Sequence, residues 1–416
     1  MSESTTLQLA DRCVMCGLCI PHCPTYQLSQ NENESPRGRI SLIQGLLKGQ
    51  LQADSSLLKH LDSCLQCRAC ESKCPSGVPY GQIMDSVRQQ LTTDKQLSPP
   101  WTSRLVMRLF ATGPRALGRI QHGIYLYQWL KLHHLTRYLG YFGFSGLKRL
   151  HRLLPAQLEE PTRAISLYPA DTKVPVKGKL SLFTGCANRL FDQEAQRASL
   201  FLLNRLGYVV SVPQEQVCCG ALHRHEGRHE TSDKLTAQNI NSFARSQGEH
   251  IISIASGCSA HLKAYPERLN GESNVFASQV EDITAFLARA KWPNAYTFAP
   301  LEEKVLVHEA CLQRNVLKQG TSSYELLAQI PQLDVESLNG NEFCCGAAGS
   351  HMLSQPVQAD KLLAPKVDAT REQKGSLLVT TNIGCALHIQ AGLRERGILI
   401  EVMHPVTLLA RQLRTA

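Results

Sequence analysis

Two cysteine runs near the start of this 416-residue sequence constrain its fold more than any other feature. Each run has the spacing Cys-x2-Cys-x2-Cys-x3-Cys-Pro, and the second lies 51 residues after the first at all four cysteines. The eight positions are Cys13, Cys16, Cys19, Cys23, Cys64, Cys67, Cys70 and Cys74. Because this is the bacterial iron–sulfur spacing, the runs predict two clusters.

The spacing also predicts which cysteines share a cluster. Three cysteines at three-residue intervals wrap a loop around one cubane, and the fourth normally reaches across to the other cluster. We therefore expect one 4Fe–4S cluster on Cys13, Cys16, Cys19 and Cys74, and a second on Cys64, Cys67, Cys70 and Cys23. Zinc sites usually carry paired Cys-x2-Cys knuckles, so two identical quadruple frames favour iron over zinc or a disulfide framework.

The composition indicates a globular protein in a reducing compartment. Hydrophobic residues make up 43% of the chain and charged residues 19%, which is ordinary for such proteins. The polar stretch Met1 to Asp11 has no apolar core of an export signal, and no run of about 18 apolar residues predicts a spanning helix. We expect a cytoplasmic protein whose sixteen cysteines hold metal.

The formal net charge of +9 is unevenly distributed. Nine Lys/Arg and no Asp or Glu lie between Gln96 and Leu158, which indicates an anionic partner such as a membrane surface. No nucleic-acid-binding signature accompanies this charge, so we do not expect a nucleic-acid partner.

Aromatic side chains are interleaved with this basic charge. They are Trp101, Phe110, Tyr125, Tyr127, Trp129, Tyr138, Tyr141, Phe142 and Phe144, and Gly113-Pro114, Gly140 and Gly143 divide them into short helices. Basic amphipathic helices of this kind suit peripheral binding to the inner face of the cell membrane. The favoured alternative is packing on the body of the protein or on a partner subunit.

Helices are expected between the two cysteine runs. Pro36-Arg37-Gly38-Arg39 opens one that continues to Leu47, and Leu57 to Leu61 indicates another turn. The two arginines are candidates to lie near a cluster, where positive charge favours its reduced state. The alternative is a solvated helix start.

The last 240 or so residues contain a duplication, preceded by a proline-rich linker from Ala156 to Lys177. Its corresponding cysteines are offset by 125 to 127 residues, pairing Cys186 with Cys311, Cys218 with Cys344, Cys219 with Cys345 and Cys258 with Cys385. In each copy, apolar β-branched runs end near a cysteine and a helical pattern follows, as from Ala195 to Leu206. This alternation predicts a parallel sheet covered by helices.

Each copy should bring four cysteines together, because the carboxyl ends of parallel strands meet at one edge. The first candidate site is Cys186, Cys218, Cys219 and Cys258, and the second is Cys311, Cys344, Cys345 and Cys385. They predict one or two further iron–sulfur clusters; buried structural cysteines are the alternative.

The predicted fold is therefore α+β overall. A helical dicluster domain (1–95) precedes a basic aromatic segment and linker (96–177). Two α/β units with parallel sheets follow, the first Cys-Cys-Gly unit (178–292) and the second (293–416).

The Cys-Cys-Gly units resemble the cysteine-rich domain of heterodisulfide reductases and of lactate-utilisation proteins. The order of two ferredoxin motifs, Pro36-Arg37-Gly38-Arg39 and two such units resembles the glycolate oxidase iron–sulfur subunit family. The reductase domains end in Cys-x-x-Cys, whereas Cys258 and Cys385 are followed three residues later by His261 and His388. These histidines are candidate extra ligands or neighbours of the site; local helix contacts are the favoured alternative.

The resemblance implies an oxidoreductase subunit that carries electrons from partner FAD-binding glycolate oxidase subunits to a membrane quinone or another acceptor. Hydride abstraction needs a cofactor such as flavin, and no G-x-G-x-x-G or P-loop motif places one on this chain. The alternatives are the iron–sulfur subunit of an anaerobic glycerol-3-phosphate or D-lactate dehydrogenase, a heterodisulfide-reductase-like enzyme, or a docking scaffold.

Overall fold

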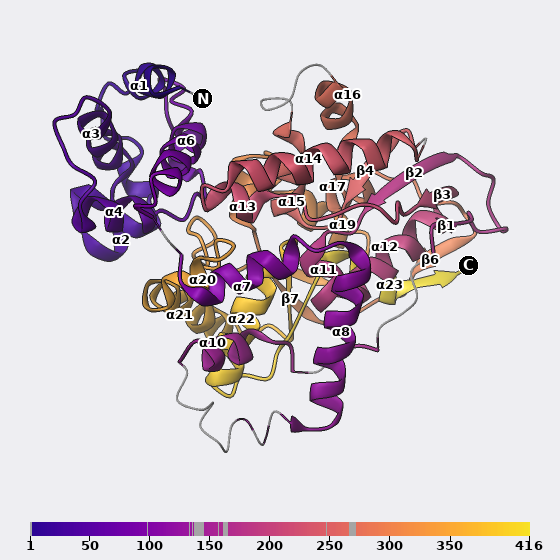
Figure 1. The fold of residues 1–416 in the computed structure, drawn as a ribbon. Helices are drawn as coiled ribbons and strands as arrows, with labels where there is room; N and C mark the ends of the chain where they lie inside the picture. The colour runs from indigo at the N-terminus through magenta and orange to yellow at the C-terminus, as the bar shows by residue number, and fades with distance from the viewer. Residues whose placement is uncertain are drawn as a thin grey trace.

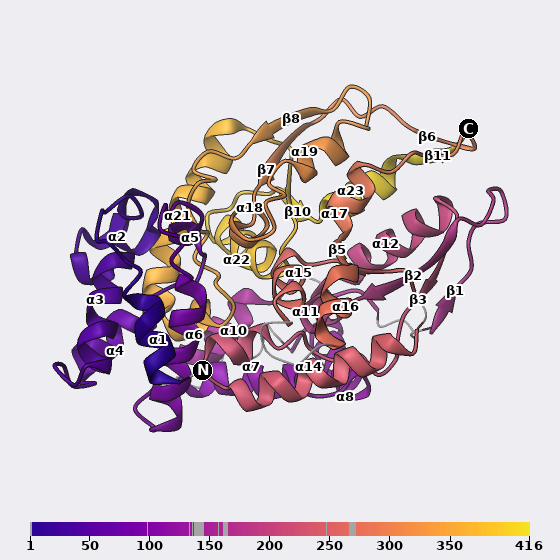
Figure 2. The same cartoon turned by 90° about the horizontal axis from the view of Figure 1, so that it is seen from above.

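The computed structural model describes residues 2–97, 99–132, 134, 136, 145–156, 158–160, 165–246, 248–265 and 272–416. Its helical N-terminal part lies at one end of the molecule and the C-terminus at the other (Figures 1 and 2). The architecture is mixed α/β with parallel sheets, as predicted.

Short helices separated by cysteine loops form the N-terminal part. They are α1 (Glu3–Ala10), η1 (Ile20–His22), α2 (Pro24–Ser29), η2 (Glu32–Glu34), α3 (Pro36–Leu47), α4 (Ser55–Asp62), α5 (Ala69–Ser72) and α6 (Tyr80–Thr93). Helix α3 begins as predicted, because Pro36 occupies its first turn and the Ser35 hydroxyl accepts a hydrogen bond from the Gly38 amide. Ile43, Leu61 and Ile83 from three helices form the core that fixes the cysteine loops.

The basic aromatic segment contributes α7 (Trp101–Phe110), α8 (Pro114–Trp129) and α10 (Ser145–Leu153). Helix α7 packs against α20 (His351–Ser354), and α10 packs against α22 (Ile383–Glu395). Arg149 and Arg152 of α10 both form ion pairs with Asp360. Part of the predicted basic surface is therefore used in internal packing.

Other residues of this segment face solvent or fall outside the described ranges. Leu126, Trp129 and Leu130 at the end of α8 are exposed. Tyr138, Tyr141, Phe142, Phe144, Gly140 and Gly143 lie outside the described residues. None of the helices in the described ranges combines the length and apolar character needed to cross a membrane.

The first sheet has the strand order β1-β3-β2-β4-β5. Its strands are β1 (Leu167–Tyr168), β2 (Gly178–Phe183), β3 (Tyr208–Ser211), β4 (His250–Ser253) and β5 (Val280–Asp282). All pairings are parallel except that of β1, which runs antiparallel to β3. The segment 156–177, which its prolines led us to predict as a linker, thus contains the edge strand β1.

The second sheet repeats this topology, which confirms the duplication. Its order β10-β9-β7-β8 matches β5-β4-β2-β3 of the first sheet, and all its pairings are parallel. Its strands are β7 (Lys304–His308), β8 (Asp334–Ser337), β9 (Leu377–Thr380) and β10 (Glu401–Met403).

Helices cover both sheets. Those of the first unit are α11 (Cys186–Phe191), α12 (Gln193–Arg205), α13 (Ala221–His225), α14 (His229–Ala244), α15 (Ser256–Lys263), α16 (Glu272–Gln279) and α17 (Ile283–Ala288). The second unit adds α18 (Cys311–Asn315), α19 (Ser322–Leu327), α20, α21 (Pro356–Gln373), α22 and α23 (Pro405–Gln412).

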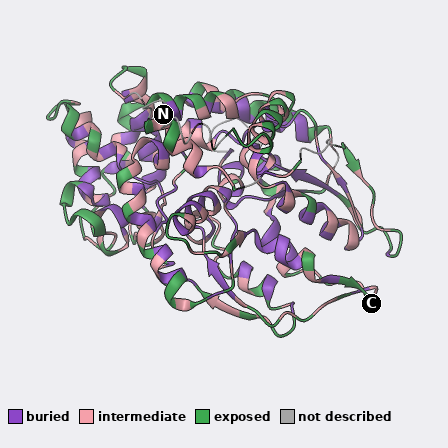
Figure 3. Cartoon of the chain, turned by 90° about the horizontal axis from the view of Figure 1, so that it is seen from below, coloured by how far each residue is buried: buried purple, intermediate pink, exposed green. Residues whose placement is uncertain are grey.

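The two units pack against each other reciprocally. Helix α12 packs on α23, and α19 packs on α17. Within the second unit, β6 (Tyr296–Phe298) pairs antiparallel with β11 (Leu413–Thr415). Leu182, Ile252, Val305 and Val379 from the two sheets belong to one apolar core, and Figure 3 shows these sheets among the buried parts of the molecule. A shared core holds the cysteine-bearing strand ends of both units in a fixed relation.

Candidate metal centres

The structure brings Cys13, Cys16, Cys19 and Cys74 around one small cavity, the first ferredoxin cavity. Gly17 enters it with a φ of +83°, which a glycine adopts without strain. Arg37 also lines the cavity and donates a hydrogen bond of 3.2 Å to the Met15 carbonyl. These four cysteines are therefore close enough to share one group.

A second small cavity, the second ferredoxin cavity, is lined by Cys23, Cys64, Cys67 and Cys70. Tyr80 closes one side, and its hydroxyl donates to the Cys64 Sγ at 3.6 Å. The grouping is the crossed one that the spacing predicts, while the ligand assignment itself stays a prediction.

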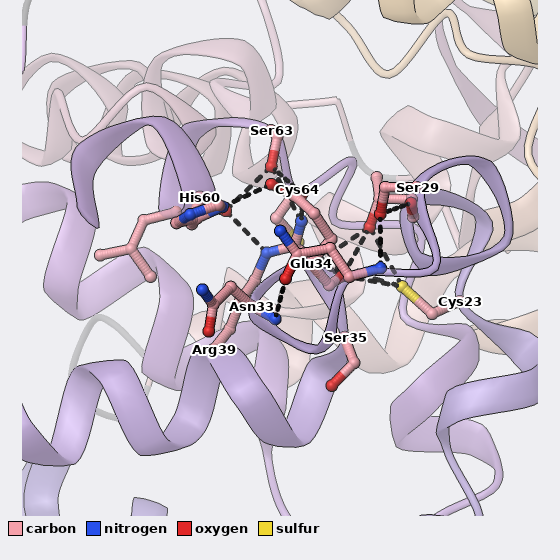
Figure 4. A network of polar contacts seen from close by, with 12 residues as sticks. Cys23, Ser29, Asn33, Glu34, Ser35, Arg39, His60, Ser63 and Cys64 are labelled. Atoms are coloured by element: carbon pink, nitrogen blue, oxygen red, sulfur yellow. Dashed lines mark hydrogen bonds and ion pairs between the residues drawn. The ribbon is translucent and has the colours of Figure 1, made fainter. Parts of the chain in front are cut away.

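Arg39 supplies a buried positive charge beside this second cavity and is only 1% exposed. It forms an ion pair of 2.5 Å with Glu34, whose other oxygen lies 2.6 Å from His60 Nδ1. These side chains gather next to Cys23 and Cys64, as Figure 4 shows. Arg37 and Arg39 thus each line a cavity, and the alternative of a solvated helix start is wrong for Arg39.

Burial makes the thiolate form costly at three of these cysteines when no cation is bound. Burial raises the pKa of the Cys19 thiol to about 11. Burial, followed by the charge of Cys311, raises the pKa of Cys67, and burial does the same for Cys70. A bound metal ion supplies the compensating positive charge, so the donor set fits a metal group.

In the first Cys-Cys-Gly site, the Sγ atoms of Cys186 and Cys218 lie 3.4 Å apart. Hydrogen bonds from Cys218 and Cys258 hold the pKa of Cys219 well below its ordinary value. The four predicted cysteines of the first site therefore converge.

Side-chain hydrogen bonds to backbone carbonyls hold the Cys-Cys-Gly loop of the first site in place. Tyr265 donates to the Cys219 carbonyl at 2.7 Å, and Asn239 donates to the Cys218 carbonyl at 3.0 Å. Gly220 has a φ of +91°, and an added Cβ would lie 2.9 Å from the Ser232 hydroxyl. The third residue of Cys-Cys-Gly is thus needed for both its conformation and its space.

In the second Cys-Cys-Gly site, the Sγ atoms of Cys311 and Cys344 lie 4.0 Å apart. A ring nitrogen of His308 and the Sγ atoms of Cys345 and Cys385 all lie within 4.8 Å of one another. All three side chains are buried, and burial holds the pKa of His308 well below its ordinary value. This site therefore contains a neutral imidazole as well as four thiols.

Two family models match the parts of the chain that carry these sites. A 4Fe-4S dicluster domain matches residues 9–78. A cysteine-rich domain, CCG, matches twice, over residues 180–263 and 305–390.

Two similar proteins align with nearly the whole chain. The "Probable glycolate oxidase iron-sulfur subunit" of Bacillus subtilis (strain 168) is 28% identical over 410 residues, covering 93% of this chain and 89% of its own. The "Glycolate oxidase iron-sulfur subunit" of Escherichia coli (strain K12) is 29% identical over 392 residues, covering 91% and 89%. The chain resembles glycolate oxidase iron–sulfur subunits over 91–93% of its length.

A second group of similar proteins covers only part of the chain. "Lactate utilization protein A" of Halalkalibacterium halodurans is 27% identical over 243 residues, which are 57% of this chain and 98% of that protein.

The two histidines that replace the last cysteine of the reductase pattern have different surroundings. His388 is buried, and its Nε2 lies 3.3 Å from the Ala359 carbonyl of the neighbouring helix α21, so this contact is not made within its own helix. His261 is also buried, and its ring lies edge-on to Tyr265, whose hydroxyl donates to the Cys219 carbonyl. His261 is therefore a neighbour of the first site, and a ligand role for either histidine stays a prediction.

Sequence reasoning did not single out His308. The signal was present in the repeat, because aligning Cys186 with Cys311 places Phe183 opposite His308. A polar residue that replaces a buried aromatic one in an otherwise matching strand indicates a local difference in function.

Proposed function

We propose that this chain is the electron-transfer subunit of a 2-hydroxy-acid oxidase, with glycolate or lactate as the class of substrate. Bound iron–sulfur clusters would accept and release single electrons. The names of the similar proteins and the cysteine sets described above support this proposal. Cys13, Cys16, Cys19 and Cys74 would hold one 4Fe–4S cluster, and Cys23, Cys64, Cys67 and Cys70 the other.

The observation that carries the proposal is the contact between two candidate sites. Cys67 of the second ferredoxin cavity shares one apolar cluster with Cys311 and Cys344 of the second Cys-Cys-Gly site. Leu65 and Leu362 complete this cluster, and both are buried. Two redox groups separated by a dry apolar contact are well placed to exchange electrons without losing them to solvent.

The substrate would react on a partner. Hydroxy-acid oxidation needs a hydride acceptor, and the sequence carries no flavin or nucleotide fingerprint. The proposed partners are therefore FAD-binding subunits, from which this chain would take electrons.

The acceptor side of the proposal is a membrane quinone. Leu126, Trp129 and Leu130 are exposed at the end of α8, and Lys131 follows them. Exposed Trp and Leu beside a basic residue suit the lipid interface, so we place the protein at the inner face of the cell membrane as a peripheral subunit. Binding to anionic lipid vesicles should weaken in W129S, and unchanged binding would contradict this placement.

The test of the proposed function combines metal analysis with EPR of the anaerobically isolated, dithionite-reduced protein. Two cubanes alone account for about eight irons per chain. A clear excess of metal that is lost in C219S or C345S would make the Cys-Cys-Gly sites metal centres. Iron at about eight per chain, unchanged by either substitution, would confine redox work to the N-terminal part.

Turnover measurements distinguish an electron-transfer role of the Cys-Cys-Gly sites from a role as a docking scaffold. With added flavoprotein partners, C219S and C345S should lose electron transfer to a quinone while still assembling. A docking scaffold would retain turnover, and hydroxy-acid oxidation by the purified chain alone would contradict a pure electron-transfer role.

A further inference from the structure

The two Cys-Cys-Gly sites differ at one position of the strand that leads into them. β2 ends at Phe183 and β7 ends at His308, and the two residues correspond in the repeat. Phe183 pairs with Ser253 in the first sheet, and His308 pairs with Thr380 in the second. In both units the residue at this position therefore pairs with a residue that carries a hydroxyl group.

The exchange creates a hydrogen bond that the first unit lacks. The Nδ1 of His308 lies 2.9 Å from the Thr380 hydroxyl. The corresponding Ser253 hydroxyl has no hydrogen-bond partner among the residues that the structure describes. Thr380 thus fixes the orientation of the His308 ring.

The other ring nitrogen of His308 is left without a partner. His308 is 2% exposed, and its Nε2 makes no hydrogen bond within the described ranges. A buried polar atom of this kind is rare in folded proteins and calls for an explanation. Since Nδ1 is held by Thr380, Nε2 is the nitrogen that remains free to bind a ligand.

The surroundings indicate that this ligand is a metal. A ring nitrogen of His308 lies within 4.8 Å of the Sγ atoms of Cys345 and Cys385. Histidines that bind metals usually donate their second N–H to a nearby acceptor, which sets the tautomer. Thr380 can accept that proton from Nδ1, and this leaves the Nε2 lone pair available.

We propose that His308 binds, through Nε2, the metal group held by Cys345 and Cys385, so that the second Cys-Cys-Gly site is a mixed nitrogen–sulfur centre. This inference rests on the proposed function, because it requires that the site hold metal. The first site has Phe183 in the same place, which offers no donor atom.

The two centres would then differ in their ligands. A neutral imidazole adds a donor without adding negative charge to the metal group, whereas a thiolate in its place would add charge and lower the potential. Since the first site has the same four cysteines and no donor at this position, the duplication would give two sites of similar fold and different ligand sets.

The test uses chain labelled with ¹⁵N only in histidine, isolated anaerobically. Pulsed EPR should detect a histidine nitrogen coupled to a paramagnetic centre, and H308F, which installs the residue of the first unit, should abolish that coupling. H388F is the matched control, because His388 is a buried histidine of the same unit whose Nε2 faces the Ala359 carbonyl. It should leave the coupling unchanged. H308C, which offers a thiolate, should keep the metal, lose the coupling and lower the potential of the centre.

The outcomes separate the two proposals. If C345S removes metal in excess of about eight irons, while H308F keeps both that metal and an unaltered spectrum, the histidine ligand is disproved and the proposed function stands. If C345S removes no metal, the site holds none, and the proposed centre and its histidine ligand both fail. Loss of the coupling in H308F but not in H388F supports the inference.

Discussion

Asn315, the last residue of α18, donates a 2.9 Å hydrogen bond to the backbone carbonyl of Cys67. This bond joins the helix that begins at Cys311 to the loop of the second ferredoxin cavity. The two residues are 248 positions apart in sequence. The bond therefore marks a contact between the N-terminal part and the second Cys-Cys-Gly unit.

Substituting Asn315 by Leu should weaken the contact between the N-terminal part and the second Cys-Cys-Gly unit. The Cys67 carbonyl would lose its partner in a mostly buried place, at a cost of about 1–3 kcal/mol. We expect a lower unfolding midpoint in urea and, in the proposed complex with flavoprotein partners, slower electron transfer from the ferredoxin clusters to an added acceptor. N294L, at an exposed turn position, is the control. Equal turnover in the two variants would show that the bond does not matter for transfer.

Tyr80 should tune the second ferredoxin cluster. Its hydroxyl donates to the Cys64 Sγ at 3.6 Å, and such bonds stabilise the more negative, reduced cluster. Y80F keeps the ring in the core and removes only the hydroxyl. We expect unchanged iron content and a more negative potential in an EPR-monitored redox titration. A potential equal to that of the unsubstituted protein would mean that the contact is not made in the loaded protein.

Arg39 should stabilise the fold through its buried ion pair with Glu34. Arg39→Met leaves the Glu34 carboxylate among buried groups without its partner, which typically costs about 3–5 kcal/mol. The double variant Arg39→Met, Glu34→Gln removes both charges and should recover much of that loss. Chemical denaturation of the two variants provides the comparison. If the double variant is no more stable than the single one, the loss comes from packing rather than from the unpaired charge.

The cysteine arrangement could be predicted because its determinants are local in sequence. A cubane requires thiolates at fixed short intervals, so the spacing from Cys13 to Cys23 and its repetition from Cys64 encode the two cavities directly. The duplication of the Cys-Cys-Gly units could be predicted for a similar reason, since each strand–cysteine–helix element recurs at a nearly constant offset. The parallel sheets follow from that alternation.

Contacts between distant segments could not be predicted. Asn315 meets Cys67 only because the N-terminal part docks on α18, and nothing near either residue encodes this. The role of His308 depends on the register of β7 against β9, which sets it opposite Thr380. Glu34 looks like an ordinary polar residue in sequence, and its burial follows from the meeting of η2, α3 and α4 around Arg39.

His404 should make stability depend on pH. It links the two units, since its Nε2 donates to the Ile254 carbonyl at 3.0 Å while its Nδ1 accepts from the Val406 amide at 3.2 Å. Burial lowers the pKa of His404 to about 4, against an ordinary value of 6.5. Between these two values the unfolded chain binds the proton and the folded chain does not, so this contribution to stability is complete above pH 6.5 and is lost as the pH falls.

The variant H404N tests this prediction, because Asn keeps an acceptor at the start of α23 but does not titrate. The difference in unfolding free energy between the two proteins should be largest near pH 7. It should shrink by about 2 kcal/mol by pH 5, since each pKa unit corresponds to roughly 1.4 kcal/mol. Urea denaturation at constant ionic strength measures both curves. A difference that stays constant from pH 7 to pH 5 would mean that the imidazole at position 404 takes up its proton as readily in the folded chain as in the unfolded one.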